Sequence, residues 1–226
     1  MSGRREPVIT IDGPAGAGKS TAAREVARRL GFKLVDTGSL YRALAWAVAR
    51  AGVNVSDEAA LEALLARIRV ELAGDRVLID GHDVTGEIRT LEIGMLTSKL
   101  TALPSVRAKM TPIQRSLAAA GGVVLEGRDT GSVVCPDAEV KIYLDADLAE
   151  RARRRRDELA ARGIAEDYGN VKADMAQRDR QDTEREIAPL RKPPGAIIVD
   201  STGVPPSTVV QIILDAVEQA RCCTRS

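Results

Sequence analysis

The feature that most constrains the fold is a glycine-rich run between an apolar stretch and a helical one. Residues 13–20 read Gly-Pro-Ala-Gly-Ala-Gly-Lys-Ser, which has the spacing Gly-x4-Gly-Lys-Ser of a phosphate-binding loop. Residues 8–11 before it are β-branched and predict a buried strand, while residues 21–30 after it have the apolar spacing of a helix. Glycines in such a unit let consecutive N–H groups and the positive end of the helix converge on one anion. The sequence therefore predicts a binding site for ATP or GTP.

The end of this loop carries side chains suited to phosphate and to a metal ion. Lys19 can reach the β- and γ-phosphates of a nucleotide, and the Ser20 hydroxyl can ligate Mg²⁺. Asp36 has two open roles, one in the Mg²⁺ site through a water molecule and the other as the N-cap of a helix.

Short runs rich in Val, Ile or Leu alternate with helical stretches along the chain. The strand candidates are residues 8–11, 33–35, 123–125, 140–144 and 197–199. This alternation predicts an α/β fold in which helices cover both faces of a parallel sheet. At 226 residues the chain fits one such domain with insertions, or at most two small domains.

Two helices are predicted from their ends. One covers residues 147–162, with Asp147 at its N-cap and Glu150 three residues later in a capping-box arrangement. Gly163 closes this helix. The other covers residues 207–220 and starts after two prolines.

Two regions interrupt the alternation. The first region predicts a short helix at residues 57–68 and then a hairpin of residues 70–72 and 77–79, so we expect a small β insertion there. The second, residues 151–185, is highly charged and poor in large apolar residues. Its arginines allow three interpretations: a solvated helix face, a nucleic-acid patch, or a flap whose arginines meet the phosphates only after closure.

Composition excludes several function classes. The net charge of +1 and an aromatic content of 2% argue against a nucleic-acid-binding protein. Three cysteines without metal-ligand spacing and a single histidine argue against a disulfide framework, a zinc site and Ser-His-Asp catalysis. No apolar run approaches the ~18 residues of a membrane span, and residues 1–6 lack the apolar centre of a signal peptide. We therefore expect a cytoplasmic protein, without membrane or nucleic-acid partners.

Arginines follow two of the predicted strands, at the edge where a parallel sheet binds ligands. They lie within residues 36–42, Asp-Thr-Gly-Ser-Leu-Tyr-Arg, and residues 126–129, Glu-Gly-Arg-Asp. If a phosphoryl group is transferred from the nucleotide to a second phosphate, this acceptor needs no general base because its oxygen is already ionised. The arginines would offset the repulsion between the negatively charged donor and acceptor. Arg178, Asp182 and Arg185 have the spacing of one helix face, which an intrahelical Arg–Asp pair explains equally well.

The chain resembles the bacterial cytidylate kinase family in six runs that occur in the same order and at similar separations. The runs are ITIDGPAGAGKS, DTGSLYR, GEIRT, EGRDTGSVVCPDA, KIYLDA and RDRQDTEREIAPL. The resemblance implies a P-loop NTPase fold with a five-stranded parallel core, a nucleoside-monophosphate-binding insertion and a helical lid. It places the core in residues 1–38, 105–150 and 184–226, the insertion in residues 39–104 and the lid in residues 151–183. The implied reaction is the transfer of a phosphoryl group from MgATP to CMP or dCMP.

The resemblance also implies roles for individual residues. It assigns Arg42, Arg128 and Arg185 to the acceptor phosphate. It assigns Thr37, Arg107 and Asp129 to cytosine, and Ser98, Arg178 and Asp182 to the ribose and its surroundings. The catalytic residues would be Lys19, Arg128, Arg178 and Arg185, and the ATP phosphates would be held by Gly13, Pro14, Ala15, Gly16, Ala17, Gly18, Lys19, Ser20 and Thr21. Thr37 departs from the family, which usually has serine there, and its extra methyl group crowds the pocket.

Other functions fit the phosphate-binding loop alone. A kinase for UMP, or for a hydroxyl acceptor such as shikimate or a sugar, is one alternative, although a hydroxyl acceptor calls for a base or a base-like carboxylate rather than for arginines. A GTPase switch is another, but it requires Asn-Lys-x-Asp after a strand. Residues 170–174 have these letters displaced by one and lie in the charged segment. We expect a monomer.

Overall fold

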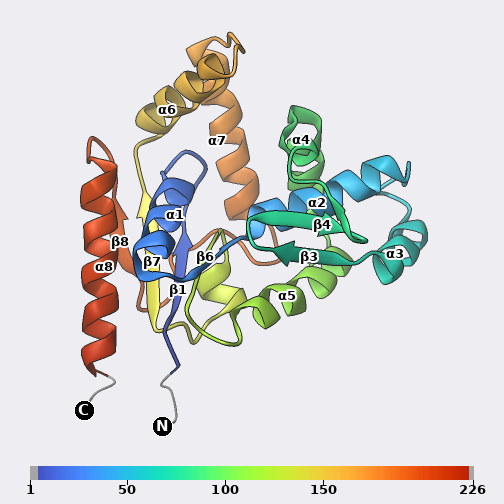
Figure 1. Ribbon diagram of the computed structural model, residues 1–226. Coiled ribbons are helices and arrows are strands. Elements are labelled where there is room, and N and C mark those ends of the chain that lie inside the picture. Colours follow the sequence, from blue (N-terminus) through green and yellow to red (C-terminus); the bar gives the residue numbers. More distant parts are fainter. Residues whose placement is uncertain (1–4, 224–226) are drawn as a thin grey trace. The chain divides into compact units, whose positions relative to one another are not determined.

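The computed structural model describes residues 5–223 (Figure 1). The chain divides into two compact units. The first contains Met1–Leu34 and Ala120–Ser226, and the second contains Val35–Ala119. The segment predicted to be a lid belongs to the first unit.

A five-stranded sheet has the strand order β2-β6-β1-β7-β8. Strand β1 pairs in parallel with β6 and β7, and β7 pairs in parallel with β8. The predicted α/β fold and all five predicted strands are confirmed, with each strand extended at its carboxyl end. The strands are β1 (Val8–Asp12), β2 (Lys33–Asp36), β6 (Val123–Gly127), β7 (Val140–Asp145) and β8 (Ile197–Asp200).

Helices α1 (Lys19–Leu30) and α8 (Pro206–Cys223) pack side by side against the sheet of the first unit. Their apolar residues form one core with the inward side chains of β1, β7 and β8. Ile9, Ile142 and Ile213 in this core are fully buried. Because aromatic residues make up only 2% of the chain, branched aliphatic side chains fill this core.

Helices α6 (Leu148–Ala161) and α7 (Tyr168–Glu184) form a hairpin with a small core of its own (Figure 1). Helix α6 ends at Ala161 with Arg162 as its C-cap, and Gly163 follows with φ 77°, in agreement with the predicted end of this helix. The predicted capping box is wrong. Asp147 makes no side-chain cap; instead its backbone N–H donates to the Thr202 hydroxyl. The Glu150 carboxylate accepts from two arginines of its own helix, which compete with the N-cap amide for it.

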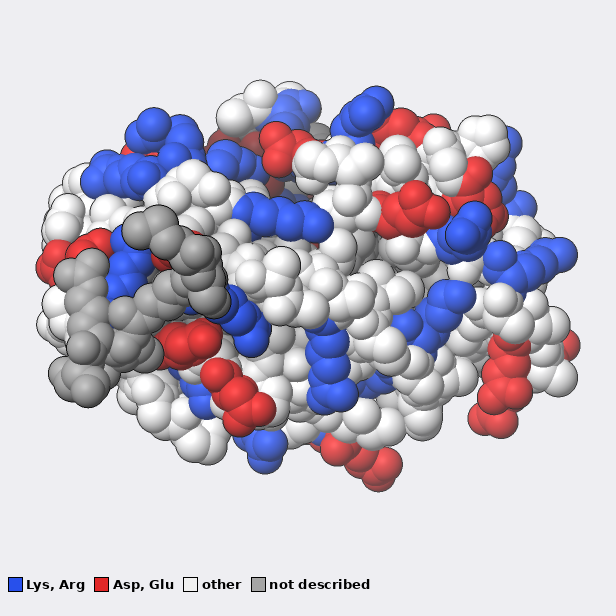
Figure 2. All heavy atoms as spheres, turned by 60° about the horizontal axis from the view of Figure 1, so that its bottom comes forward, with Lys and Arg blue, Asp and Glu red and all other residues white. Residues whose placement is uncertain are grey.

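The α6 arginines have acidic partners on the same helix. Arg153 and Arg154 both pair with Glu150, and Arg155 pairs with Glu158, each at 2.9 Å. On the face shown in Figure 2, basic and acidic side chains are interspersed. The ion pairs within α6 support a solvated helix face for this part of the charged segment.

Among the described residues, no helix combines the length and the apolar character needed to cross a membrane.

The second unit contains the predicted β insertion. Strands β3 (Val70–Ala73) and β4 (Arg76–Ile79) form the predicted antiparallel hairpin, and β5 (His82–Asp83) adds a third strand. The helices are α2 (Thr37–Arg50), α3 (Glu58–Arg67), α4 (Leu91–Leu100) and α5 (Pro104–Ala118), with a 3₁₀ turn η1 at Glu87–Arg89. Residues 37–42 belong to α2, because the Asp36 carboxylate caps this helix by accepting from the Ser39 amide at 3.0 Å.

Adjacent isoleucines on α8 test the packing of this helix. The exposed fraction is 0% for Ile213 and 37% for Ile212. Ile213→Ala leaves a cavity in the core, so we expect the free energy of unfolding to fall by about 2–5 kcal/mol. Ile212→Ala makes the same change in helix propensity and should cost less than ~1 kcal/mol. Urea unfolding of both variants measures the difference in the free energy of unfolding. Equal decreases for the two variants would contradict the finding that Ile213, and not Ile212, faces the core.

Candidate functional site

The phosphate-binding loop joins the carboxyl end of β1 to the amino end of α1. A Cβ atom on Gly13 would lie 1.9 Å from the Leu144 carbonyl oxygen, so only glycine fits at this point. Gly18 precedes α1 with φ 92°, a left-handed conformation that glycine adopts without strain. The first N–H groups of α1 therefore face the loop without a side-chain cap, as an anion site at a helix N-terminus requires.

Lys19 is folded over this loop. Its side chain is buried, and Nζ donates to the Pro14 carbonyl oxygen at 2.6 Å. Burial, with the positive charge of Arg128 as a second cause, lowers the pKa of Lys19 to about 7. A negatively charged ligand in the loop would reverse both effects, because it would stabilise the ammonium form.

The Ser20 hydroxyl donates to the Glu126 carboxylate at 2.7 Å. Glu126 is buried on β6, opposite Ile11 of the parallel neighbour β1. Glu126 lies within the run Glu-Gly-Arg-Asp, but the sequence alone assigns it no role. An acidic residue close to the carboxyl end of a buried strand was the available signal. Only the pairing of β6 with β1 shows that it meets the loop serine.

Arginines and aspartates form a second cluster in the first unit, here called the Arg128 cluster and made of Arg128, Asp129, Asp182 and Arg185. Arg128 Nε donates to Asp182 Oδ2 at 2.9 Å. Arg185 lies 3.7 Å from Asp129 Oδ1 and 3.9 Å from Asp182 Oδ1. Burial alone would raise the pKa of Asp182, but the neighbouring arginines hold it below its usual value. Asp182 therefore stays ionised and keeps the guanidinium groups in place.

The predicted helical row 178, 182, 185 is only partly helical. Arg178 and Asp182 lie on α7, whereas Arg185 follows its last turn in an extended conformation. The carboxylate of Asp182 bonds to Arg128 from the loop after β6, so the row faces another segment of the chain. Asp182 therefore pairs with an arginine outside its own helix, in contrast to the intrahelical Arg–Asp pair that the spacing alone allows.

Arg151 is a buried residue that sequence analysis did not single out. Its guanidinium donates to the carbonyl oxygens of Ala146 and Ala15 and, at 2.6 Å, to Asp179 on α7. One side chain thus connects the start of α6, the phosphate-binding loop and the helix that carries Arg178 and Asp182. In the sequence it is one of several arginines on α6, and nothing there distinguishes it from its exposed neighbours.

The second unit carries the remaining predicted residues. Thr37 is buried at the start of α2, and Arg42 lies in the second turn of that helix. Ser98 lies on α4, where its hydroxyl contacts the Gly94 carbonyl oxygen at 3.4 Å. Arg107 of α5 is buried, donates to the Thr101 carbonyl oxygen and stacks over the Tyr41 ring at 5.9 Å. Both carboxylate oxygens of Asp36 are engaged by Ser39, which confirms its N-cap role.

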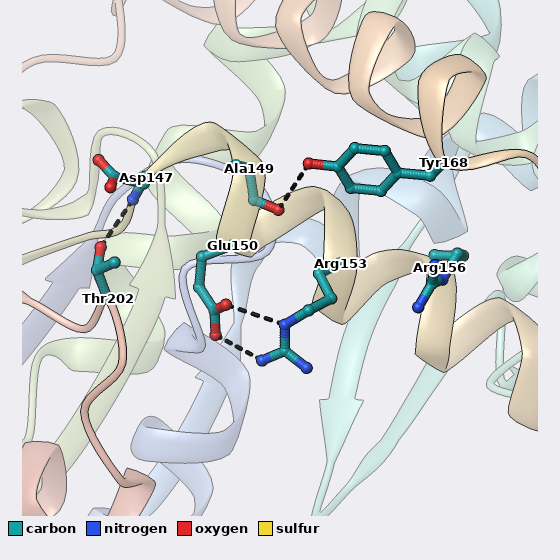
Figure 3. Close-up of a pocket in the computed structure, with 7 residues that line it drawn as sticks. All are labelled: Asp147, Ala149, Glu150, Arg153, Arg156, Tyr168 and Thr202. Atoms are coloured by element: carbon teal, nitrogen blue, oxygen red, sulfur yellow. Dashed lines mark hydrogen bonds and ion pairs between the residues drawn. The ribbon is translucent and has the colours of Figure 1, made fainter.

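A hollow of about 510 Å³ lies at the start of α6 (Figure 3). Arg153 and Arg156 point from α6, and Tyr168 of α7 donates to the Ala149 carbonyl oxygen. The Glu150 carboxylate in this hollow is already paired with Arg153. The hollow is therefore lined by charges that neutralise one another.

Comparisons with known proteins agree with this geometry. A sequence model described as cytidylate kinase matches residues 9–219. The cytidylate kinase of Symbiobacterium thermophilum is 48% identical over 217 residues, which are 94% of this chain and 96% of that protein. The cytidylate kinase of Pelotomaculum thermopropionicum is 46% identical over 220 residues, covering 95% and 97% of the two chains.

A solved structure is similar in fold. An uncharacterized protein from Eubacterium ventriosum has a TM-score of 0.53 and 12% sequence identity, and the match covers 94% of this chain and 99% of that one. At this identity the likeness concerns the fold alone.

The low pKa of Lys19 predicts a pH-dependent stability. The folded-state pKa of about 7 lies below the ordinary 10.5, so the cost of burying the ammonium group is fully present below pH 7 and falls as the pH rises. Lys19→Met should therefore stabilise the nucleotide-free protein more at pH 6.5 than at pH 9.5, by roughly 2–3 kcal/mol. Urea unfolding at the two pH values measures this difference. Lys33→Met, at an exposed position, is the matched control, and a pH-independent effect of Lys19→Met would contradict the prediction.

Proposed function

This chain belongs to the cytidylate kinase family, and from that premise we propose that it transfers the γ-phosphoryl group of ATP to CMP or dCMP, releasing ADP and CDP or dCDP. The observation that carries the proposal is that the phosphate-binding loop and the Arg128 cluster both lie in the first unit, after neighbouring strands. Lys19 and Ser20 begin α1 after β1, and Arg128 follows the neighbouring strand β6. Donor and acceptor groups on adjacent parallel strands are held at the ligand-binding edge of the sheet.

The donor nucleotide binds with its phosphates in the loop at residues 13–21. Backbone N–H groups and the amino end of α1 face the phosphates, and Lys19 exchanges its bond to the Pro14 carbonyl oxygen for a bond to phosphate oxygen. A bound phosphate stabilises the charged ammonium form of Lys19 and so raises its lowered pKa. Protonation of Lys19 therefore favours ATP binding, and ATP binding favours the protonated lysine.

Mg²⁺ fits the oxygen groups at this point. The Ser20 hydroxyl and the Glu126 carboxylate are hard oxygen donors, and Mg²⁺ in kinases is typically held by few protein oxygens together with waters and substrate phosphates. When bound, Mg²⁺ would supply positive charge that offsets the negative charge of the phosphates during transfer. We assign Ser20 to the ion, with Glu126 as its neighbour. The contribution of Asp36 through water, in addition to its capping role, stays a proposal.

The acceptor phosphate requires positive charge and no base. We assign Arg42, Arg128 and Arg185 to this phosphate, with Arg178 close to the reacting groups. Arg128 is held by Asp182, so its guanidinium is oriented before the substrate arrives and little freedom is lost on binding. An ionised phosphate oxygen then attacks the γ-phosphorus in line, while the lysine and the arginines stabilise the charge that spreads over the equatorial oxygens.

The base and the sugar are recognised by polar side chains. We assign Thr37, Arg107 and Asp129 to cytosine, and Ser98, Arg178 and Asp182 to the ribose and its surroundings. Asp129 is buried, so its carboxylate can accept from the amino group of cytosine in a site with little water. The threonine at position 37 keeps the hydroxyl of the family's usual serine.

The α6–α7 hairpin is assigned as the lid. Its helices share a small core, against which Ala15 of the phosphate-binding loop packs, and a shared core suits a segment that moves as a unit. Closure would exclude water, which otherwise could accept the γ-phosphoryl group. We also assign residues 39–104 to the binding of the acceptor nucleotide and residues 1–38, 105–150 and 184–226 to the core. A cytoplasmic monomer completes the proposal.

One assay tests the proposed reaction. ADP release is coupled to a spectrophotometric signal and measured with CMP, dCMP, UMP, AMP, GMP and shikimate at equal concentrations. We expect CMP and dCMP to give turnover well above the others, because cytosine is the only pyrimidine base among them that carries an amino donor. Activity confined to shikimate or another uncharged acceptor would overturn the proposal.

The choice of cytosine over uracil is tested at Asp129. Asp129→Asn keeps one acceptor oxygen but gains an amide donor for the uracil carbonyl, and an unpaired buried polar group costs about 1–3 kcal/mol. We therefore expect the ratio of kcat/KM for CMP to that for UMP to fall about 5-fold or more. Asp137→Asn, at an exposed position in the same segment, is the control. Equal losses on both substrates would exclude a role of Asp129 in base choice.

A further inference from the structure

Asp12 is a fully buried carboxylate at the last position of β1, directly before Gly13. Three donors meet it. Oδ1 accepts from the backbone N–H and the hydroxyl of Thr130, each at 2.8 Å, and Oδ2 accepts from the Gly131 N–H at 2.7 Å. Burial raises the pKa of Asp12, and the bonds from Gly131 and Thr130 lower it, so the three bonds offset part of the cost of placing a charge here.

The partners of Asp12 directly follow the two acceptor-side residues. Thr130 and Gly131 come immediately after Arg128 and Asp129, and they begin the π-helical turn η2 (Thr130–Val134). Asp12 itself lies opposite Gly127 in the parallel pairing of β1 with β6. One carboxylate therefore connects the start of the phosphate-binding loop with the segment that carries Arg128 and Asp129.

We propose that Asp12 is a positioning residue that fixes Arg128 and Asp129 relative to the phosphate-binding loop, and so sets the alignment of acceptor and donor. The inference rests on the proposed function. A carboxylate is required because both oxygens accept hydrogen bonds. An amide has one acceptor oxygen only, and its NH₂ group would face the Gly131 N–H or the two Thr130 donors. The ladder between β1 and β6 ends at Gly127, so backbone pairing of the two strands does not extend to Arg128.

Packing at Gly131 shows how closely this segment lies against β1. A Cβ atom on Gly131 would lie 2.7 Å from Thr10 Oγ1, 3.2 Å from Pro193 Cγ and 3.3 Å from Asp12 Oδ2. Thr10 is fully buried, and within the described residues its hydroxyl oxygen has no hydrogen-bond partner. Thr10 thus limits the space for η2 without bonding to it, whereas Asp12 supplies the bonds.

The experiment compares Asp12→Asn with wild type in steady-state kinetics and in binding of a non-hydrolysable ATP analogue. We expect kcat/KM for CMP to fall about 30-fold or more and the preference for CMP over UMP to weaken, while the dissociation constant of the analogue changes less than about 3-fold. Thr130→Val removes one of the three bonds and should give a smaller loss in the same direction. All variants are assayed at least 10 °C below their measured Tm, so that a loss of folded protein does not enter.

Matched variants at the same contact separate positioning from general damage. Thr10→Val removes only an unbonded hydroxyl and should leave the kinetics of wild type. Gly131→Ala pushes the segment away from β1 without changing a charge, and should reproduce the loss on CMP. Thr10→Ala combined with Gly131→Ala removes the closest of the three contacts of the added methyl group and should restore part of the lost kcat/KM.

The outcomes distinguish this inference from the proposed function. If the wild-type enzyme does not phosphorylate CMP, the proposed function fails. If the wild type is active and Asp12→Asn retains its kcat/KM, or loses ATP-analogue affinity as much as CMP turnover, Asp12 is not a positioning residue. If Asp12→Asn does not fold, Thr130→Val decides, because it removes one bond to Asp12, and wild-type kcat/KM for CMP in that variant would overturn the inference.

Discussion

The site depends on the parallel pairing of β1 with β6. Because the two strands run in the same direction, the loop after β1 and the segment after β6 leave the sheet at the same edge. Ser20 can therefore reach Glu126, and Asp12 can reach Thr130, across more than 100 residues of sequence. A change in strand order would separate these groups even if every strand and helix formed unchanged.

Buried charge is the second constraint on this unit. Lys19, Arg128 and Arg185 are cations with little contact to water, and each lies near a carboxylate. The carboxylates hold the guanidinium groups in place, and the planar guanidinium fork matches the geometry of phosphate oxygens. A buried lysine changes its pKa readily, and burial lowers the pKa of Lys19 to about 7. The site is thus arranged for anions before any substrate binds.

Particular residues show where local patterns mislead. The spacing of Asp147 and Glu150 predicts a capping box that does not form. The arginines of α6 pair with Glu150, and the Asp147 backbone N–H donates to the hydroxyl of Thr202, which is distant in the sequence. Asp36 fulfils its local role because its partner, Ser39, is three residues away. Local rules succeed where the competing partners are also local, and they fail where a distant segment or a neighbouring charge offers a better bond.

The sequence by itself determined the strands, the phosphate-binding loop, the hairpin of the insertion and the family, because each depends on periodicity or on spacing within a short run. Tertiary structure alone decided that Glu126 meets Ser20, that Asp182 turns to Arg128, and that Arg151 reaches the Ala15 carbonyl oxygen. Only the tertiary structure also shows that Asp12 accepts hydrogen bonds from Thr130 and Gly131. The physical reason is that these bonds join residues whose separation along the chain carries no information about their separation in space, which strand order and helix packing set.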